Sequence, residues 1–362
     1  MIELQDIFRQ YGEEHRQCHP LSAEQAKAMR AIIACRTAAL GAHVDQCDEC
    51  GYERISYNSC RNRHCPKCQT FAKEEWLDRQ RQNLLNTRYF HVVFTLPDNL
   101  HPICLRNPRR LYDILFKAAS QTLLELCADP KYLGATPGIT AILHTWGQNL
   151  HYHPHLHCVV TGGGLADGFR WISSRRKFFL PIKVLSRKFR GKFLYYLRQA
   201  MPDLPAQTVE LLYRKDWVLY CKPPFGDAGK VMDYLGRYTH RVAISNNRLI
   251  KLEGGRVFFR WRDYSDGNRV KVMSLAADEF LRRFLMHILP SGFRKIRHFG
   301  LVASRNKSKR LVLCRWLTRT RTPAPPIHVS DRLTALFGED FNRCPCCRTG
   351  HLCRGAPSAK TA

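Results

Sequence analysis

One stretch decides how this chain is expected to fold: His151-Tyr-His-Pro-His-Leu-His157, which continues as Cys-Val-Val-Thr-Gly-Gly-Gly164. In an extended strand successive side chains point to opposite faces, so His155 and His157 share one face while Leu156 turns toward the core. The valines that follow continue a buried strand, and the three glycines predict the turn that ends it. Two imidazoles on one face indicate a metal-binding strand.

The composition indicates a negatively charged partner. The chain has 362 residues, with 58 Lys or Arg against 30 Asp or Glu and a formal net charge of +28. Such an excess repels itself unless a polyanion offsets it, and nucleic acid is the natural candidate. A hydrophobic content of 44% suffices for buried cores, and the length allows two or three domains.

A membrane surface is the weaker alternative partner. We find no run of about 18 apolar residues, and the N-terminus is mixed and amphipathic rather than a signal peptide. The protein is therefore expected in the cytoplasm. In a large intracellular chain, 16 cysteines that cluster as CxxC pairs favour zinc over disulfides.

The densest cysteine cluster predicts a structural zinc site. Its two CxxC pairs are Cys47 with Cys50 and Cys65 with Cys68. Pairs of this kind fold back so that four thiolates surround one Zn²⁺ as a tetrahedron. Their separation is slightly shorter than the usual range of about 15 to 20 residues, so Cys60 and His64 stay open as further ligands.

The other cysteines have different interpretations. Cys18 and Cys35 have no neighbour at ligand spacing, and we interpret both as core or incidental residues. The tail holds Cys344, Cys346 and Cys347, followed by His351 and Cys353. These residues offer a small second zinc site but lack a matching second knuckle.

The elements around the histidines predict a sheet covered by helices. Buried strands are expected at residues 91–97 and 138–146, with an amphipathic helix at 111–127 between them. Together with the histidine strand they give the order strand, helix, strand, strand, which suits an α+β fold. Further strands are expected within 209–220, and a hairpin is expected at 248–263.

Two segments with charge of one sign predict surfaces for DNA. Residues 170–198 and 291–321 each hold ten Lys or Arg and no acidic residue. The first segment interleaves these charges with aromatic side chains, a mixture that favours a phosphate track with base-stacking platforms over an ordinary solvated face. The expected DNA contacts are Arg175, Arg176, Lys177, Arg237, Arg241, Arg294, Lys295 and Arg297.

A second informative stretch holds Tyr234 and Tyr238. On a helix, residues four apart lie on one face, so these two phenols would stand side by side. An isolated pair of this kind is most often half-buried packing. A two-histidine metal site upstream in the same domain favours a catalytic interpretation instead.

Histidines on a strand and tyrosines on a helix fit one reaction class. Mg²⁺ or Mn²⁺ held by the imidazoles would bind a nonbridging oxygen of a phosphodiester, and a tyrosine would attack phosphorus. The products would be a covalent 5′-phosphotyrosine and a free 3′-OH, and the second tyrosine would act on a second strand. No GxxxxGK[ST] loop is present, and the reaction needs no external energy source.

A third metal ligand with an oxygen donor is expected, because hard cations prefer oxygen. Gln148 is the leading candidate and His153 is the alternative. His151 and His153 also remain open as groups behind the ligands or as DNA contacts, since Pro154 limits regular strand pairing ahead of His155.

Five motifs resemble those of the insertion-sequence-ninety-one family of bacterial rolling-circle transposases, over roughly residues 20 to 310 and in the expected order. They are Cys47-Asp-Glu-Cys-Gly51, Asn58-Ser-Cys-Arg-Asn-Arg-His-Cys-Pro-Lys-Cys-Gln69, His91-Val-Val-Phe-Thr-Leu-Pro97, His153-Pro-His-Leu-His157 and Tyr234-Leu-Gly-Arg-Tyr-Thr-His-Arg-Val-Ala-Ile-Ser245. The resemblance implies an HUH endonuclease domain, an antiparallel sheet with flanking helices, that cuts and joins single-stranded DNA at transposon ends and target. It also implies an N-terminal zinc-binding domain, a metal pair at His155 and His157, and nucleophiles at Tyr234 and Tyr238. No helicase segment is present, so a host helicase would unwind the DNA.

We therefore expect three regions. Residues 1–86 form a helical and zinc-binding domain, residues 87–290 form the HUH domain, and residues 291–362 form a basic region with a linker, a small Cys-rich knuckle and a disordered tail. The alternatives are a plasmid or phage rolling-circle replication initiator and a non-enzymatic zinc-dependent nucleic-acid-binding protein. A zinc hydrolase is disfavoured because residues 145–166 contain no acidic residue to act as a general base.

Overall fold

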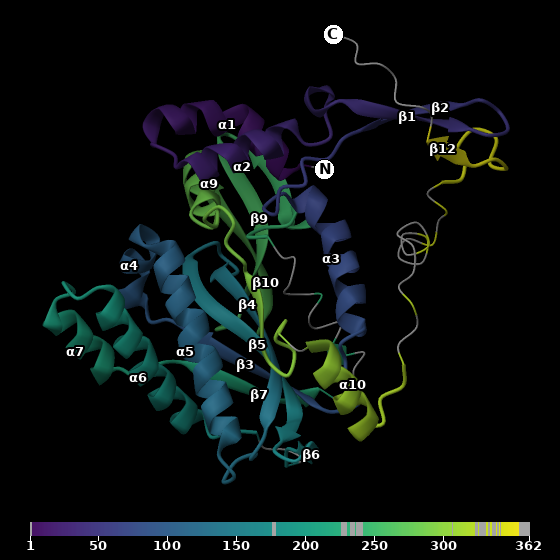
Figure 1. Cartoon of the computed structure of the whole chain (residues 1–362). Coiled ribbons are helices and arrows are strands. Elements are labelled where there is room, and N and C mark those ends of the chain that lie inside the picture. Colours follow the sequence, from purple (N-terminus) through teal and green to yellow (C-terminus); the bar gives the residue numbers. More distant parts are fainter. Residues whose placement is uncertain are drawn as a thin grey trace.

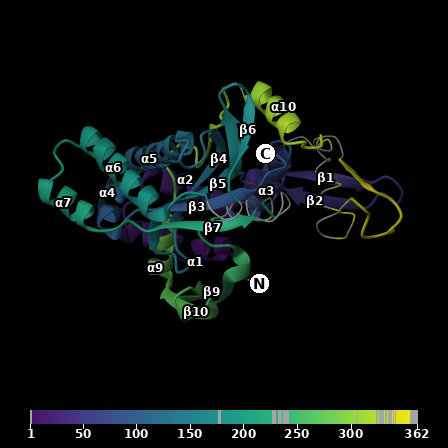
Figure 2. The same ribbon diagram turned by 90° about the horizontal axis from the view of Figure 1, so that it is seen from below.

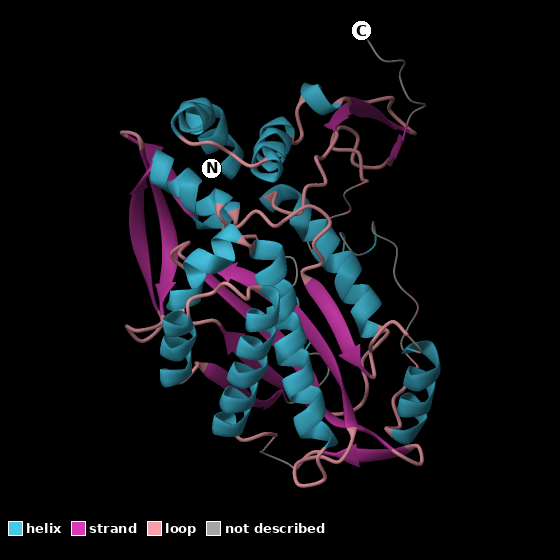
Figure 3. Ribbon diagram, turned by 60° about the vertical axis from the view of Figure 1, so that its left-hand side comes forward, coloured by secondary structure: helices cyan, strands magenta, loops and turns pink. Residues whose placement is uncertain are grey.

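The structure is a computed structural model. It describes residues 2–175, 179–225, 242–305, 307–322 and 342–354, together with residues 230, 231, 236, 325, 331, 334, 338 and 340. Strands of three separate antiparallel sheets, drawn in magenta in Figure 3, alternate with helices, so the chain has the expected α+β fold.

A six-stranded antiparallel sheet forms the centre of the molecule. Its order is β11-β4-β5-β3-β7, and β6 pairs with the far end of β5. The strands are β3 (Tyr89–Thr95), β4 (Thr136–Trp146), β5 (Tyr152–Ala166), β6 (Arg170–Ser173), β7 (Leu219–Phe225) and β11 (Ile296–Gly300). The histidine strand β5 lies between β3 and β4, so both of its edges are hydrogen-bonded and its side chains are fixed on two opposite faces.

One face of this sheet is covered by helices on the left of Figure 1. They are α4 (His101–Arg106), α5 (Pro108–Ala128), α6 (Ile182–Ala200) and α7 (Ala206–Arg214). Alternate residues of β5, namely Leu156, Cys158 and Val160, point into this layer and join the largest buried core. The neighbouring residues His155, His157 and Val159 therefore face the other side.

The histidine face is covered by α3 (Pro66–Arg81), on the right of Figure 1. Trp76 and Leu77 of this helix form a small buried cluster with Val159 of β5 and with Val231. Val159 is two residues after His157 on β5. The histidines therefore lie next to a buried apolar cluster.

A second layer joins the N-terminus to the region after the expected tyrosine helix. Helices α1 (Leu4–Cys18) and α2 (Ala23–Ala34) pack with α9 (Ala277–Leu285) onto the sheet of β8 (Leu249–Glu253), β9 (Arg256–Asp263) and β10 (Arg269–Ala276). Figure 2 shows α1 and α9 on the same side as β9 and β10. The rings of Phe8 and Phe284 meet edge to face at 5.6 Å between centroids. Residues 1–86 therefore share a core with residues far along the chain.

The third sheet combines both ends of the chain. β1 (Ala42–Cys47) pairs with β2 (Glu53–Tyr57) on one edge and with β12 (Leu352–Arg354) on the other. Figure 1 shows this small sheet set apart from the body. Short 3₁₀ turns are η1 (Ala38–Leu40), η2 (Asp98–Leu100) and η3 (Asn246–Arg248), and α10 (Lys307–Leu317) packs near β6.

Several expectations for local structure are confirmed. The hairpin at 248–263 is β8 and β9, and the expected strand at 138–146 is β4. The strands expected within 209–220 are wrong in their first half, since α7 ends only at Arg214. The boundary expected after residue 290 cuts through the central sheet, because β11 is its edge strand.

The turn expected at Gly162 to Gly164 is also wrong, because β5 runs through all three glycines. A Cβ on Gly162 would lie 2.8 Å from the Arg88 carbonyl oxygen, and one on Gly164 would lie 2.5 Å from the Thr136 carbonyl oxygen. The glycines are needed because neighbouring backbones approach closely, and not because the chain turns.

The base-stacking platforms expected in residues 170–198 are mostly core residues. Phe189 and Phe193 of α6 are 0% exposed and pack around Trp217 with ring centroids 5.4 and 5.2 Å away. Their spacing of four residues matches one face of an amphipathic helix, which explains the burial. Tyr195, on the opposite side of α6, is exposed. Within the described ranges, no helix is both long and apolar enough to cross a membrane.

Candidate active site and cysteine clusters

Three imidazoles meet on the α3 face of the central sheet. His144 of β4 is the antiparallel register partner of His155 on β5, and His157 lies one pleat further along. One ring nitrogen from each of these histidines lies within 4.8 Å of the others. The Nε2 atoms of His155 and His157 are only 3.0 Å apart. Three nitrogen donors thus converge on one point, as metal ligands do.

Hydrogen bonds behind the rings orient these donors. His155 donates from Nδ1 to the backbone carbonyl of His153 at 2.7 Å, so in the neutral ring the lone pair is on Nε2. His157 contacts Nε2 of His91 through its own Nδ1 at 3.0 Å, which leaves its Nε2 directed toward His155. His91 comes from β3, so three neighbouring strands build the site. A metal-binding histidine characteristically uses its second nitrogen in this way.

Burial favours the neutral form of two histidines of this site, His91 and His155. Desolvation lowers the pKa of His91 to about 3, with the positive charge of Lys222 adding to the effect. It lowers the pKa of His155 to about 4. Both rings therefore present unprotonated nitrogen at neutral pH, which is the form that binds a metal.

His144 was not expected from the sequence as the third group. Gln148, the leading candidate, lies beyond the end of β4, where its amide donates to the Tyr264 hydroxyl at 3.2 Å. His153, the alternative, lies in a different group with Asp98 and His101. A signal was present, because folding the strands at 138–146 and 152–157 back on each other around residues 147–151 brings His144 near His155.

The tyrosine positions lie outside the described residues, as do Arg176, Lys177, Arg237 and Arg241. Two described residues are close to Tyr234 in the sequence. Val231 is 0% exposed and belongs to the buried cluster with Val159 and Leu77. A Cβ on Gly236 would lie 3.1 Å from Leu77. Val231 and Gly236, on either side of Tyr234 in the sequence, therefore both lie beside Leu77 of α3.

The cysteines form two clusters instead of the single expected one. Cys35, Cys60, Cys65 and Cys68 form the first, with all four Sγ atoms within 4.8 Å of one another. Cys35 and Cys60 each lie 3.6 Å from Cys68. The expected set of Cys47, Cys50, Cys65 and Cys68 is wrong, because β1 and β2 carry the first pair away from α3, whose N-terminus holds the second.

The other residues considered as zinc ligands lie as follows in the structure. Cys35, interpreted as a core residue, is buried within the first cluster, and Cys60 joins it. His64 does not join, because its Nε2 accepts from the backbone N–H of Leu289 at 3.3 Å. Cys47 and Cys50 instead meet Cys344 and Cys347 of the tail.

The residues expected to contact DNA differ in their surroundings. Arg175 and Arg294 are exposed. Arg297 is not a free surface cation: it pairs with Asp113 of α5 at 2.5 Å and lies over the Phe116 ring at 4.3 Å. Burial lowers the pKa of Lys295 to about 8, with Arg63 adding repulsion. Pairing of β11 with β4 directs this segment toward the body of the protein, which explains the difference.

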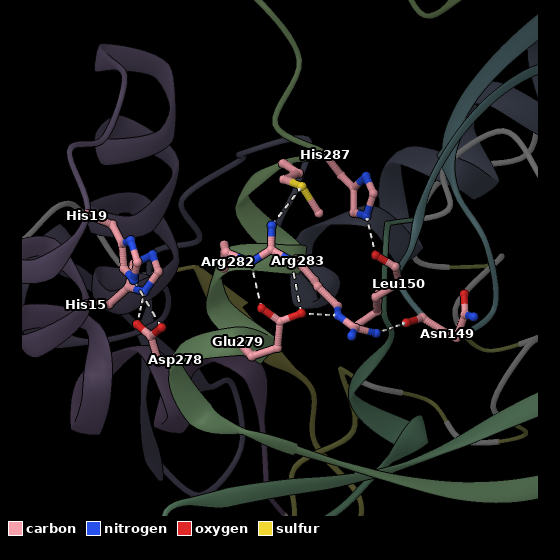
Figure 4. Close-up of polar contacts among 10 residues, drawn as sticks. His15, His19, Asn149, Leu150, Asp278, Glu279, Arg282, Arg283 and His287 are labelled. Atoms are coloured by element: carbon pink, nitrogen blue, oxygen red, sulfur yellow. Dashed lines mark hydrogen bonds and ion pairs between the residues drawn. The ribbon is translucent and has the colours of Figure 1, made fainter. Parts of the chain in front are cut away.

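Helix α9 links the N-terminal helices to the histidine strands (Figure 4). Asp278 accepts from His15 and His19 of α1 at 2.5 and 3.0 Å. Arg283, near the end of α9, donates to the Asn149 carbonyl. His287, two residues after the end of α9, donates to the Leu150 carbonyl. The turn between β4 and β5 is therefore held by the same helix that anchors the N-terminus.

The similarity of the chain to known families defines a DNA-processing enzyme of the transposase class with an N-terminal zinc-binding domain. Residues 138–310 match the family described as a putative transposase, and residues 7–96 match the transposase zinc-binding domain. The chain belongs to the insertion-sequence-ninety-one family of transposases.

Two relatives extend over most of the chain. A putative transposase, y4qJ, from Sinorhizobium fredii is 49% identical over 97% of this chain and 94% of its own length. The transposase for insertion sequence element IS801 from Pseudomonas savastanoi pv. phaseolicola is 29% identical over 89% of this chain and 82% of its own. No solved structure matches the chain.

Proposed function

We propose that this transposase cleaves and rejoins single-stranded DNA at the ends of an insertion sequence by rolling-circle transposition, through a covalent 5′-phosphotyrosine. The convergence of His144, His155 and His157, on the face of β5 where Val159 packs against Leu77 and Val231, is the observation that supports the proposal. Nitrogen donors for a metal and a phenol nucleophile are the two parts that this chemistry requires.

The histidine cluster suits a catalytic divalent cation. All three donors are imidazole nitrogens, and within the described part of the chain no carboxylate shares the group. A bound Mn²⁺ or Mg²⁺ would supply positive charge to a nonbridging phosphate oxygen, where negative charge grows in the transition state. An all-nitrogen set favours Mn²⁺ over the harder Mg²⁺, which differs from the oxygen donor expected from the sequence.

The tyrosines perform the covalent step. The phenol oxygen of Tyr234 or Tyr238 bonds to phosphorus while the bond from phosphorus to the 3′ oxygen breaks. The phenol loses its proton, and the leaving 3′ oxygen gains one. A free phenol has a pKa of about 10, so its proton must leave as the new bond forms. The phosphotyrosine then keeps the phosphodiester energy for joining to another 3′-OH.

The first cysteine cluster holds the structural zinc of the N-terminal domain in this proposal. Cys35 and Cys65 are buried in the same core as Phe8 and Phe284, so a metal there would fix α2 and α3 beside α9. Because α3 covers the histidine face, this zinc would also hold in place the helix that packs against the histidines.

Single-stranded DNA at the element ends and at the target is the proposed substrate, and a host helicase supplies any unwinding. The net charge of +28 supports binding to the phosphate backbone. Arg175 and Arg294 are exposed and suit this role, as do the expected Arg176, Lys177, Arg237 and Arg241.

The test is a covalent adduct assay on the full-length protein. A labelled single-stranded oligonucleotide carrying the element's end is incubated with Mn²⁺ and then run on a denaturing gel. Wild type is expected to give an adduct, Tyr234→Phe with Tyr238→Phe none, and His157→Ala at most a trace. Tyr195→Phe, at an exposed tyrosine on α6, is the matched control and should retain full yield. An adduct that persists in the double Phe variant refutes the proposed nucleophiles.

A further inference from the structure

Cysteines from opposite ends of the chain meet in the small outer sheet. Cys47 is the last residue of β1 and Cys50 follows that strand, whereas Cys344 and Cys347 come from the C-terminal segment. All four Sγ atoms lie within 4.8 Å of one another. Cys47 is 3.7 Å from Cys347, and Cys50 is 3.6 Å from Cys344. Each close pair therefore joins the two ends.

These separations match the edges of a metal–thiolate tetrahedron. A Zn–S bond of about 2.3 Å gives sulfur atoms about 3.8 Å apart at the corners of a tetrahedron. Two disulfides would instead require bonded sulfurs at about 2.05 Å. The observed 3.6 and 3.7 Å agree with the first arrangement, and the first cysteine cluster shows the same spacing.

The backbone around these cysteines is folded as two facing knuckles. The N–H of Cys50 points to Cys47 Sγ at 3.5 Å, and on the other side the N–H of Gly350 points to Cys347 Sγ at 3.3 Å. The N–H of Cys346 lies 3.4 Å from Cys344 Sγ. Donors directed at sulfur stabilise the thiolate form, which is the form that binds zinc.

Further contacts fit the two knuckles to each other. His351 donates its backbone N–H to Asp48 at 2.7 Å, and its carbonyl accepts from the Asp48 backbone at 3.1 Å. A Cβ on Gly350 would lie 2.6 Å from Cys47 Sγ, so glycine is required for this approach. Beyond the knuckle, β12 pairs with β1 from Cys47 to Asp45.

We propose that Cys47, Cys50, Cys344 and Cys347 bind a second zinc ion that fastens the C-terminal segment to the N-terminal domain. The matched zinc-binding domain, residues 7–96, contains only two of these four ligands, so the site is complete only in the full chain. It is independent of the proposed DNA chemistry and of the first cysteine cluster.

Zinc stoichiometry of the purified full-length protein, kept reduced, is the first test. Wild type is expected to carry two zinc ions per chain, and Cys344→Ser with Cys347→Ser one. The matched control is Cys346→Ser with Cys353→Ser, two exposed tail cysteines outside the cluster, which should keep two. A zinc content that is the same in wild type and in the Cys344→Ser and Cys347→Ser variant overturns the proposal.

A cut between the body and the tail provides a second readout that does not depend on a variant folding. A specific protease site is placed within residues 326–330 of the full chain, and the cut protein is passed over a size-exclusion column. The tail fragment is expected to stay with the body in zinc and to leave it after chelation. In the Cys344→Ser and Cys347→Ser background it should leave without a chelator. Release in the presence of zinc overturns the proposal, as does retention that only a reductant reverses.

Discussion

The buried imidazole of His287 predicts a specific loss of stability in acid. Its ring is 2% exposed, its Nε2 donates to the Leu150 carbonyl at 3.1 Å, and its Nδ1 accepts from the Thr145 hydroxyl at 3.2 Å. The neutral ring satisfies both partners. Burial lowers the pKa of His287 to about 4 from an ordinary value of 6.5.

This shift fixes the sign and size of the effect. Because the folded-state pKa is below the unfolded one, protonation favours the unfolded chain. Stability is fully present above pH 6.5 and falls as the pH drops toward 4. At about 1.36 kcal/mol per pKa unit the full loss is about 3 kcal/mol, and by pH 5 it is about 2 kcal/mol.

Urea unfolding at pH 7.5 and pH 5 measures this loss of stability. The variant His287→Gln keeps polar groups but does not titrate, so its stability should fall by about 2 kcal/mol less than that of wild type over this interval. Comparing the two proteins cancels the other histidines. An equal pH dependence in wild type and His287→Gln would refute the reasoning.

Three further outcomes are expected. His144→Ala should weaken Mn²⁺ binding by at least about tenfold in calorimetry, since loss of even a residue that only hydrogen-bonds to a ligand lowers metal affinity by about 10- to 100-fold. A larger effect from Gln148→Ala would contradict the assigned third ligand. His91→Phe should weaken it by about 10- to 100-fold because His157 loses its partner, and unchanged affinity would exclude that orienting role. Gly164→Ala should lower the free energy of unfolding by about 1 to 3 kcal/mol or more, because its Cβ would clash with the neighbouring strand. Gly191→Ala, in open space on α6, should raise the free energy of unfolding by about 0.5 to 1 kcal/mol. Similar effects at both positions would show that crowding between strands is not the cause.

The central site was predictable where local periodicity decides it. Alternation along one strand placed His155 and His157 on a common face, and this needs no knowledge of the rest of the fold. Finding His144 required the register between two strands. That register is shifted by a bulge between His144 and Trp146, so simple counting back from Tyr152 misses the pairing.

The cysteine ligands were not predictable from spacing because they depend on contacts between distant elements. Cys35 ends α2 and reaches Cys60, Cys65 and Cys68 only once α1 and α2 pack onto α9. The aromatic residues of α6 were a different case. Their spacing of four residues already indicated a helix face packed on a core, but the surrounding charge suggested stacking on bases.

The pairing of β12 with β1 also sets an order of events during synthesis. Cys47 lies opposite Leu352, about 300 residues later in the chain. At roughly 5 to 20 residues per second, the ribosome delivers that partner roughly 15 to 60 s after it has made β1. Until then the hairpin of β1 and β2 has a free edge and two thiols without their partners from the tail. A segment translated late therefore completes a sheet whose other two strands were translated much earlier.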